Sequence, residues 1–217
     1  GQNRLLLALR ISDNVKQNEA EPELFYSSTM HGDETTGMIL MMRLADYLLT
    51  NYGTVERATN MVNSVALYIT PAANPDGTYH GGNSTVSGSW RGNARGVDIN
   101  CDFPDPRIGA NAPYAPETQA MMDWATAHSF VAGANFHGGI ELINYPWDAW
   151  ISSVNPHADN NWWAATSLQY ATIVHANSPS GYFTGENNGV THGGDWYVVS
   201  GGRQDYMNYF HHCREVT

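Results

Sequence analysis

Residues 24–38 read LFYSSTMHGDETTGM, and this stretch decides the class of fold. Its first half, 24–30, is rich in apolar and aromatic residues and predicts a buried strand. Apolar residues at helical spacing follow over 34–50 and predict a helix that ends at the turn 51–53. A strand that passes directly into a helix is typical of α/β domains.

The rest of the chain continues this alternation of strands and helices. Further strands are predicted at 4–11, 65–70 and 130–136, and further helices at 116–128 and 157–176. The sequence therefore predicts a single α/β domain, with a central mixed, mostly parallel twisted sheet and helices on both faces. Residues 74–113 are rich in Gly, Asn and Ser and show no strong periodicity. A loop of that length is either functional or hides a missed element, and we expect it to line the functional site.

Charge and composition exclude several classes of function. The net charge is −11, and the ten basic residues form no run, so nucleic acid is not an expected partner. No apolar stretch is long enough to span a bilayer, and residues 5–11 (LLLALRI) are interpreted as a buried strand rather than a signal peptide. Many Gly, Asn, Trp and Tyr beside few Lys suit a secreted or periplasmic protein. Cys101 and Cys213 could pair or stay free, and the sequence leaves both possibilities open.

A histidine and a glutamate, His31 and Glu34, lie three positions apart at the strand-to-helix turn. Zinc in catalytic sites typically takes three protein ligands with N or O donors and one water. Alone, such a pair is more often a satisfied histidine beside a glutamate that suits a helix N-terminus. His137 closes the run FVAGANFH and offers a third ligand, because functional groups gather at strand ends in α/β sheets. His192 competes for that role, although no strand is expected before it.

Several motifs follow one another along the chain in a recognisable order: RISDN, EPELFYSSTMHGDETTG, ITPAANPDG, WRGNARGVDIN, ANFHGGIELINYPWD and YVVSGGRQDY. In this order and spacing, from about Leu5 to Thr217, the chain resembles the zinc metallocarboxypeptidases. The resemblance is strongest to the regulatory branch of the carboxypeptidase D, E, M and N type, and a bacterial source is expected. It implies the carboxypeptidase fold, one zinc ion, and hydrolysis of the last peptide bond of a peptide or protein.

The resemblance also implies which residues carry the chemistry. His31, Glu34 and His137 fall on the family's zinc ligands. Arg91 falls on the arginine that polarises the scissile carbonyl and stabilises the oxyanion, a role for preorganised positive charge. Tyr197 falls on the mobile tyrosine that closes over the substrate.

Three more residues are implied to bind the substrate. Asn100 falls on the asparagine that holds the terminal carboxylate. Asp148 and Gln204 fall on positions that line the pocket for the C-terminal side chain. In the regulatory branch this pairing goes with Lys or Arg at the substrate's C-terminus, so a basic preference is expected.

The first departure from the family follows Asn100. There the family has an arginine that grips the terminal carboxylate with two hydrogen bonds, and this chain has Cys101. Asp102 is expected to add a repelling charge nearby. Either Arg95 or Arg107 could supply the missing guanidinium, and Arg107 is favoured because proline turn signals precede it.

The second departure concerns the general base. The family's glutamate lies two residues beyond the threonine of E-V-T, past Thr217, and Glu215 falls on the wrong position for it. The family's first strand and terminal helix are also not found, so residues 1–217 are expected to form a catalytic domain that is incomplete at both ends. Two functions stay open: a zinc carboxypeptidase and a zinc-containing peptide-binding module without turnover. Cell-wall peptides are an alternative substrate for the enzyme.

Overall fold

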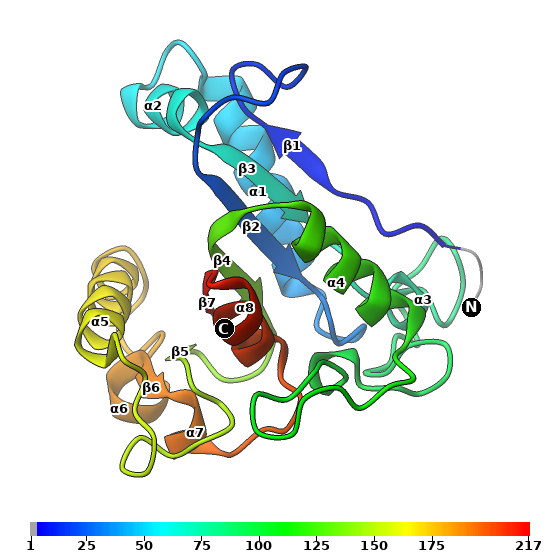
Figure 1. Ribbon diagram of the computed structural model, residues 1–217. Coiled ribbons are helices and arrows are strands. Elements are labelled where there is room, and N and C mark those ends of the chain that lie inside the picture. The colour runs from blue at the N-terminus through cyan, green and yellow to red at the C-terminus, as the bar shows by residue number, and fades with distance from the viewer. Residues whose placement is uncertain (1–3) are drawn as a thin grey trace.

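The computed structural model describes residues 4–217, which form an α/β domain around a five-stranded sheet (Figure 1). The strands lie in the order β1-β3-β2-β4-β7. Their bounds are β1 (Leu9–Ile11), β2 (Glu23–Ser28), β3 (Ala66–Thr70), β4 (Phe130–Phe136) and β7 (Arg214–Val216). Edge strand β1 runs antiparallel to β3, and the other neighbouring pairs are parallel. The predicted mixed, mostly parallel sheet is confirmed.

Helices cover both faces of this sheet, as predicted. The four principal ones are α1 (Thr36–Asn51), α2 (Glu56–Ser64), α4 (Pro116–Ala127) and α8 (Arg203–His211). Because successive strand residues point to opposite faces, Tyr68 packs in the core with α4 and α8, whereas Leu67 and Ile69 pack with α1 and α2. Both faces of the central strands are therefore buried, which explains why these strands read as nearly continuous apolar runs.

A smaller parallel sheet lies beside β7, an edge strand of the main sheet. It consists of β5 (Ile143–Tyr145) and β6 (Val190–His192), and α5 (Asn160–Ala176) packs against both strands. Short helical turns complete the described chain: α3 (Pro75–Thr78), a 3-10 turn (Ile99–Cys101), α6 (Gly185–Gly189) and α7 (Gly193–Trp196). Backbone hydrogen bonds between Asn144 and Thr217, at 2.7 and 3.1 Å, join the two sheets.

Several elements differ from the prediction. The strand expected over 4–11 covers only Leu9–Ile11, and Leu5 and Leu7 are 75% and 66% exposed, so the buried-strand interpretation is wrong there. A short strand does end at His192, contrary to expectation. Such short elements carry too few residues for a periodic signal. Residues 74–113 are irregular as predicted, apart from α3 and the 3-10 turn. Among residues 4–217, no helix has the length and apolar character needed to cross a membrane.

Candidate active site

The turn between β2 and α1 aims two of the predicted ligands. Thr29 adopts a left-handed backbone (φ 61°), and its N–H donates to the carbonyl of Phe136 at the end of β4. The backbone N–H of Glu34 then donates to the carbonyl of His31 at 3.0 Å, which closes the turn. Because β2 and β4 are parallel neighbours, their C-terminal ends meet, and His137 arrives beside the turn.

The loop that carries Arg91 docks directly onto this turn. The Arg91 carbonyl accepts hydrogen bonds from the backbone of Gly32 at 3.1 Å and from the Asn74 side chain at 3.2 Å. A Cβ atom at Gly32 would lie 2.3 Å from the backbone of Gly77, so only glycine permits this close approach. The irregular segment is thus anchored against the strand ends.

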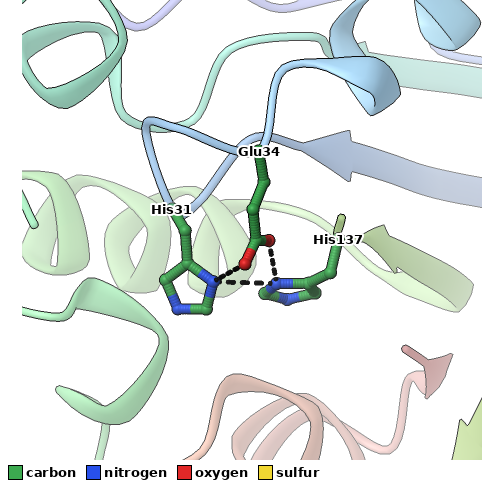
Figure 2. Close-up of side chains that lie close together, drawn as sticks. All are labelled: His31, Glu34 and His137. Carbon is green, nitrogen blue, oxygen red and sulfur yellow. Dashed lines mark hydrogen bonds and ion pairs between the residues drawn. The ribbon is translucent and has the colours of Figure 1, made fainter. Parts of the chain in front are cut away.

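His31, Glu34 and His137 converge on one point (Figure 2). His31 Nδ1 lies 2.8 Å from Glu34 Oε1, His137 Nδ1 lies 2.8 Å from Glu34 Oε2, and the two Nδ1 atoms are 3.1 Å apart. When neither Nδ1 carries a proton, lone pairs on all three side chains face each other, and a shared cation stabilises that arrangement. Two imidazoles and one carboxylate are a typical donor set for catalytic zinc, so these residues fit the metal that the sequence implies.

Asp98 supports the cluster, and the sequence had not singled it out. Its Oδ1 lies 3.0 Å from His31 Nε2, which carries the proton if Nδ1 binds a metal. Burial lowers the pKa of His31, but Asp98 and Glu34 outweigh it and raise that pKa to about 9. Burial raises the pKa of Asp98, whereas His31 and Arg91 bring it down to about 2. The signal was available, since Asp98 lies in the GVDIN motif, two residues before Asn100.

A cleft of about 300 Å³ opens beside the cluster. Four further predicted residues line it: Arg91, Asn100, Asp148 and Tyr197. Apolar side chains that sequence reasoning missed complete the wall, namely Ile140, Leu142, Trp196 and Val199. The cleft therefore combines charged, amide and apolar groups next to a candidate metal centre.

Arg91 lies at the edge of the cluster with its side chain 55% exposed. Its Nη2 lies 2.8 Å from Asp98 Oδ2, and its Nη1 lies 3.5 Å from Glu34 Oε1. Asn100 is held by its backbone N–H, which donates to Asp98 Oδ1 at 3.1 Å. One carboxylate thus positions a zinc-ligand candidate, the guanidinium and the amide. Tyr197 lines the same cleft and is 54% exposed.

Asp148 and Gln204 take different positions. Asp148 lines the cleft, and Gln204 is 1% exposed and is not among the lining residues. The Gln204 amide instead donates from behind to Asp148 Oδ1 at 3.0 Å. Burial, together with the carboxylates of Asp205 and Glu215, raises the pKa of Asp148 well above its ordinary value.

The expected repulsion from Asp102 is wrong. Its Oδ2 accepts hydrogen bonds from the backbone of Ala115 and the hydroxyl of Thr118, both at 2.7 Å. Asp102 therefore caps the start of α4 and does not line the cleft. Its side chain binds the N-terminal end of α4, where a negative charge is favourable.

The hypothesis that Arg107 replaces the missing guanidinium is not supported. Three of its nitrogens are engaged by Asp105, the carbonyl of Ala149 and the hydroxyl of Ser200. Neither Arg107 nor Arg95 lines the cleft. Among the described residues, neither of these two arginines therefore replaces the guanidinium that the family has directly after Asn100.

Other residues that the sequence left open are now located. Cys101 and Cys213 are both free, the first exposed and the second buried. Glu215 is fully buried, and its Oε2 lies 2.7 Å from Arg203 Nη2, so it does not face the cleft, in line with its exclusion as a base. His192 is buried away from the cluster, and its Nε2 accepts the N–H of Trp147 at 3.2 Å.

Comparisons with known proteins agree with the resemblance. The profile of the family described as zinc carboxypeptidase matches residues 1–217. Carboxypeptidase D of Mus musculus is 34% identical over 232 residues, which cover 100% of this chain and 16% of that protein. Carboxypeptidase M of Mus musculus is 30% identical over 234 residues, which cover 100% of this chain and 51% of that protein.

A solved structure shows that the fold is shared. The crystal structure of thrombin activatable fibrinolysis inhibitor superimposes with a TM-score of 0.77 at 18% identity. The match covers 94% of this chain and 55% of that one. The chain therefore spans about half, or less, of the length of these similar proteins.

Proposed function

Because this chain belongs to the zinc carboxypeptidase family, we propose that its protein is a zinc-dependent hydrolase that removes the C-terminal residue of peptides or proteins. One observation carries the proposal: a cluster of two imidazoles and a carboxylate stands beside a cleft with a guanidinium, a carboxamide and a buried carboxylate. The activity is a proposal for the whole protein, since the chain spans only part of its relatives.

His31 Nδ1, Glu34 and His137 Nδ1 would hold one zinc ion, which polarises a carbonyl and lowers the pKa of a bound water. Neighbouring groups keep these ligands in place. The carboxylate of Asp98 lies 3.0 Å from His31 Nε2 and accepts its N–H when Nδ1 binds the metal. Such outer contacts set the tautomer and the orientation of metal-binding histidines.

Arg91 meets the negative charge that develops on the carbonyl oxygen during attack. Asp98 holds the guanidinium in advance, so little reorganisation is needed at the moment of reaction. Tyr197, exposed at the cleft, closes over the bound peptide and reduces the access of water. Asn100 donates a hydrogen bond to the terminal carboxylate, which Cys101 beside it cannot do as an arginine would.

The proton from the attacking water needs a carboxylate with no other task. Among the described acids, only Glu34 and Asp148 line the cleft, and both have roles. In the family this step belongs to a glutamate at the position two residues beyond the threonine of E-V-T, which lies outside residues 1–217. Thr217 lines the cleft, and alternate residues of an extended strand share a face, so a residue there would face the same space.

Asp148 favours a basic residue at the substrate's C-terminus. A buried carboxylate without a cation is costly, and a Lys or Arg side chain removes that cost, whereas Leu or Phe does not. This preference follows from the position of Asp148 in the cleft and from its burial.

The test uses the full-length protein with peptides that differ only in the last residue: Arg, Lys, Leu or Phe. We expect one zinc per chain, release of that residue alone, loss of activity with a chelator, and faster cleavage after Arg and Lys. Asp148→Ala should weaken basic substrates selectively, and Asp46→Ala, an exposed acid on α1, is the matched control.

Two other results would overturn the proposal. Zinc and peptide binding without cleavage would identify a peptide-binding module. Cleavage restricted to peptides with diaminopimelate would identify a cell-wall peptidase, since such a ligand brings its own additional charges.

A secreted or periplasmic location stays a prediction from composition, to be tested by fractionation of the source cells.

A further inference from the structure

Asp148 sits on a segment that has no regular secondary structure, Trp147–Ala149. Nevertheless, all six of its backbone polar groups are hydrogen-bonded to other parts of the chain. The N–H groups of Trp147, Asp148 and Ala149 donate to His192, Asp205 and Asp205 at 3.2, 2.8 and 2.7 Å, and their carbonyls accept from Gly194, Val199 and Arg107 at 2.8, 3.0 and 2.9 Å. The segment belongs to no strand or helix, and it is held in place by contacts with side chains and backbone groups of neighbouring elements.

Asp205 makes the central contribution. It lies in the first turn of α8, is 1% exposed, and uses Oδ1 for the N–H of Asp148 and Oδ2 for the N–H of Ala149. Hydrogen bonds to a charged acceptor are shorter and about twice as strong as neutral ones. Two adjacent bonds to one carboxylate also fix the orientation of the peptide between them.

Arg107 holds the C-terminal end of the Trp147–Ala149 segment. Its Nη1 donates to the carbonyl of Ala149, its Nη2 donates to the hydroxyl of Ser200, and Asp105 holds the rest of the guanidinium. Asp105 also accepts the N–H of Gly201 at 3.0 Å. One ion pair thus ties together three segments that are distant in sequence.

The position of Asp148 leaves little tolerance for movement. A Cβ atom at Gly193 would come 1.8 Å from Asp148 Oδ1, so the carboxylate lies directly against the backbone of the cleft wall. Asp205 also places a second carboxylate near Asp148, which costs electrostatic energy. An asparagine at 205 would avoid that cost, but its NH₂ group could not accept the second backbone N–H.

We propose that Asp205 is a positioning residue for substrate selectivity: by holding the Trp147–Ala149 segment, it sets where the Asp148 carboxylate meets the substrate's terminal side chain. This inference rests on the proposed function, in which Asp148 faces that side chain. A displacement of about 1 Å in such a site can cost about 100-fold. A residue that only stabilised the fold would affect all substrates alike.

The experiment measures binding by calorimetry, with the full-length protein and peptides whose last peptide bond is reduced so that they are not cleaved. The peptides end in Arg, Leu or Glu. For Asp205→Asn we expect Kd for the Arg peptide to rise about 10-fold to 100-fold, with the Leu peptide nearly unchanged. Asp102→Asn, the same change at a carboxylate that caps α4 outside the cleft, is the matched control and should leave the Arg-to-Leu ratio unchanged.

A double-mutant cycle separates positioning from stability. In the Asp148→Ala background, Asp205→Asn should have no further effect on the Arg-to-Leu ratio, because there is no carboxylate left to place. Equal losses for all three peptides, or a further loss in that background, would overturn the proposal.

If Asp205→Asn does not fold, Arg107→Lys removes the fork to Ala149 and Ser200 while keeping the charge, and it should shift the ratio in the same direction by several-fold. If the wild type shows no preference for Arg, the proposed specificity is wrong. The positioning role is then judged by the relative Kd values for the three peptides. If Asp205→Asn leaves these relative values unchanged, the role is rejected.

Discussion

The candidate metal-binding residues and the pocket around Asp148 border the same cleft but are built in different ways. His31, Glu34 and His137 stand at the ends of β2 and β4, two adjacent parallel strands in the centre of the sheet. Asp148 stands on a segment that is held by side chains from α8, from β6 and from the loop that carries Arg107. Strand ends place residues through the sheet itself, whereas the pocket depends on individual long-range hydrogen bonds.

The two regions also differ in charge. Burial raises the pKa of Glu34 and of Asp98, but other contacts outweigh it. Hydrogen bonds to His137 and His31 lower the pKa of Glu34, and His31 and Arg91 lower that of Asp98, so both carboxylates are ionised at neutral pH. Burial and neighbouring carboxylates instead raise the pKa of Asp148. In the proposed function, the cluster holds a resident cation, and the pocket receives a cation that arrives with the substrate.

The largest effect should come from removing a metal-ligand candidate. Glu34→Ala should weaken zinc binding by more than about 100-fold, beyond what outer contacts contribute, and should abolish cleavage of basic and apolar substrates alike. Zinc competition with a chelator and peptide hydrolysis measure the two effects. Retention of stoichiometric zinc at wild-type affinity would show that the metal binds elsewhere.

The support of the cluster should matter next. Asp98→Asn should lower zinc affinity by about 10-fold to 100-fold, because His31 loses the carboxylate that orients it. The same chelator competition measures this loss, with Asp102→Asn as the control. An unchanged affinity would mean that the strand ends position His31 without help.

The selectivity of the pocket should depend on pH. Below the raised pKa of Asp148 the carboxyl is neutral and attracts no cation, and above it the carboxylate is charged. The ratio of kcat/KM for Arg-ended over Leu-ended peptides should therefore rise with pH, by at most about tenfold per pH unit. Asp148→Asn should flatten the profile. The same slope in that variant would assign the pH dependence to a different group, such as Tyr197 or Glu215.

The smallest effect is expected at Cys101. Cys101→Arg should raise kcat/KM by up to about tenfold on peptides with a free terminal carboxylate, since a charged hydrogen bond is gained while side-chain freedom is lost. Amidated peptides should not benefit. A fall in activity would indicate that this end of the cleft serves a different terminus, such as an amide or a branched cell-wall peptide.

How far the sequence predicts the molecule follows the same division. The strands that form the sheet centre and the helices that follow them were predictable, because apolar residues repeat with periods that backbone geometry imposes. The β5–β6 pair and the true extent of β1 were not, since three-residue strands contain no measurable period. Leu5 and Leu7 show the limit, because apolar character alone did not bury them.

By itself, the sequence determined the α/β class, the pairing of His31 with Glu34 in one turn, and the resemblance that the family match confirms. The resemblance predicted His137 as the third member of this group, and the structure places it beside that pair. Only the tertiary structure decided that Asp98 supports the pair and that Arg107 is engaged elsewhere. The physical reason is range. Ligands three residues apart are brought together by a local turn, whereas contacts between residues 42 to 103 positions apart depend on which strands become neighbours and where each loop is bound.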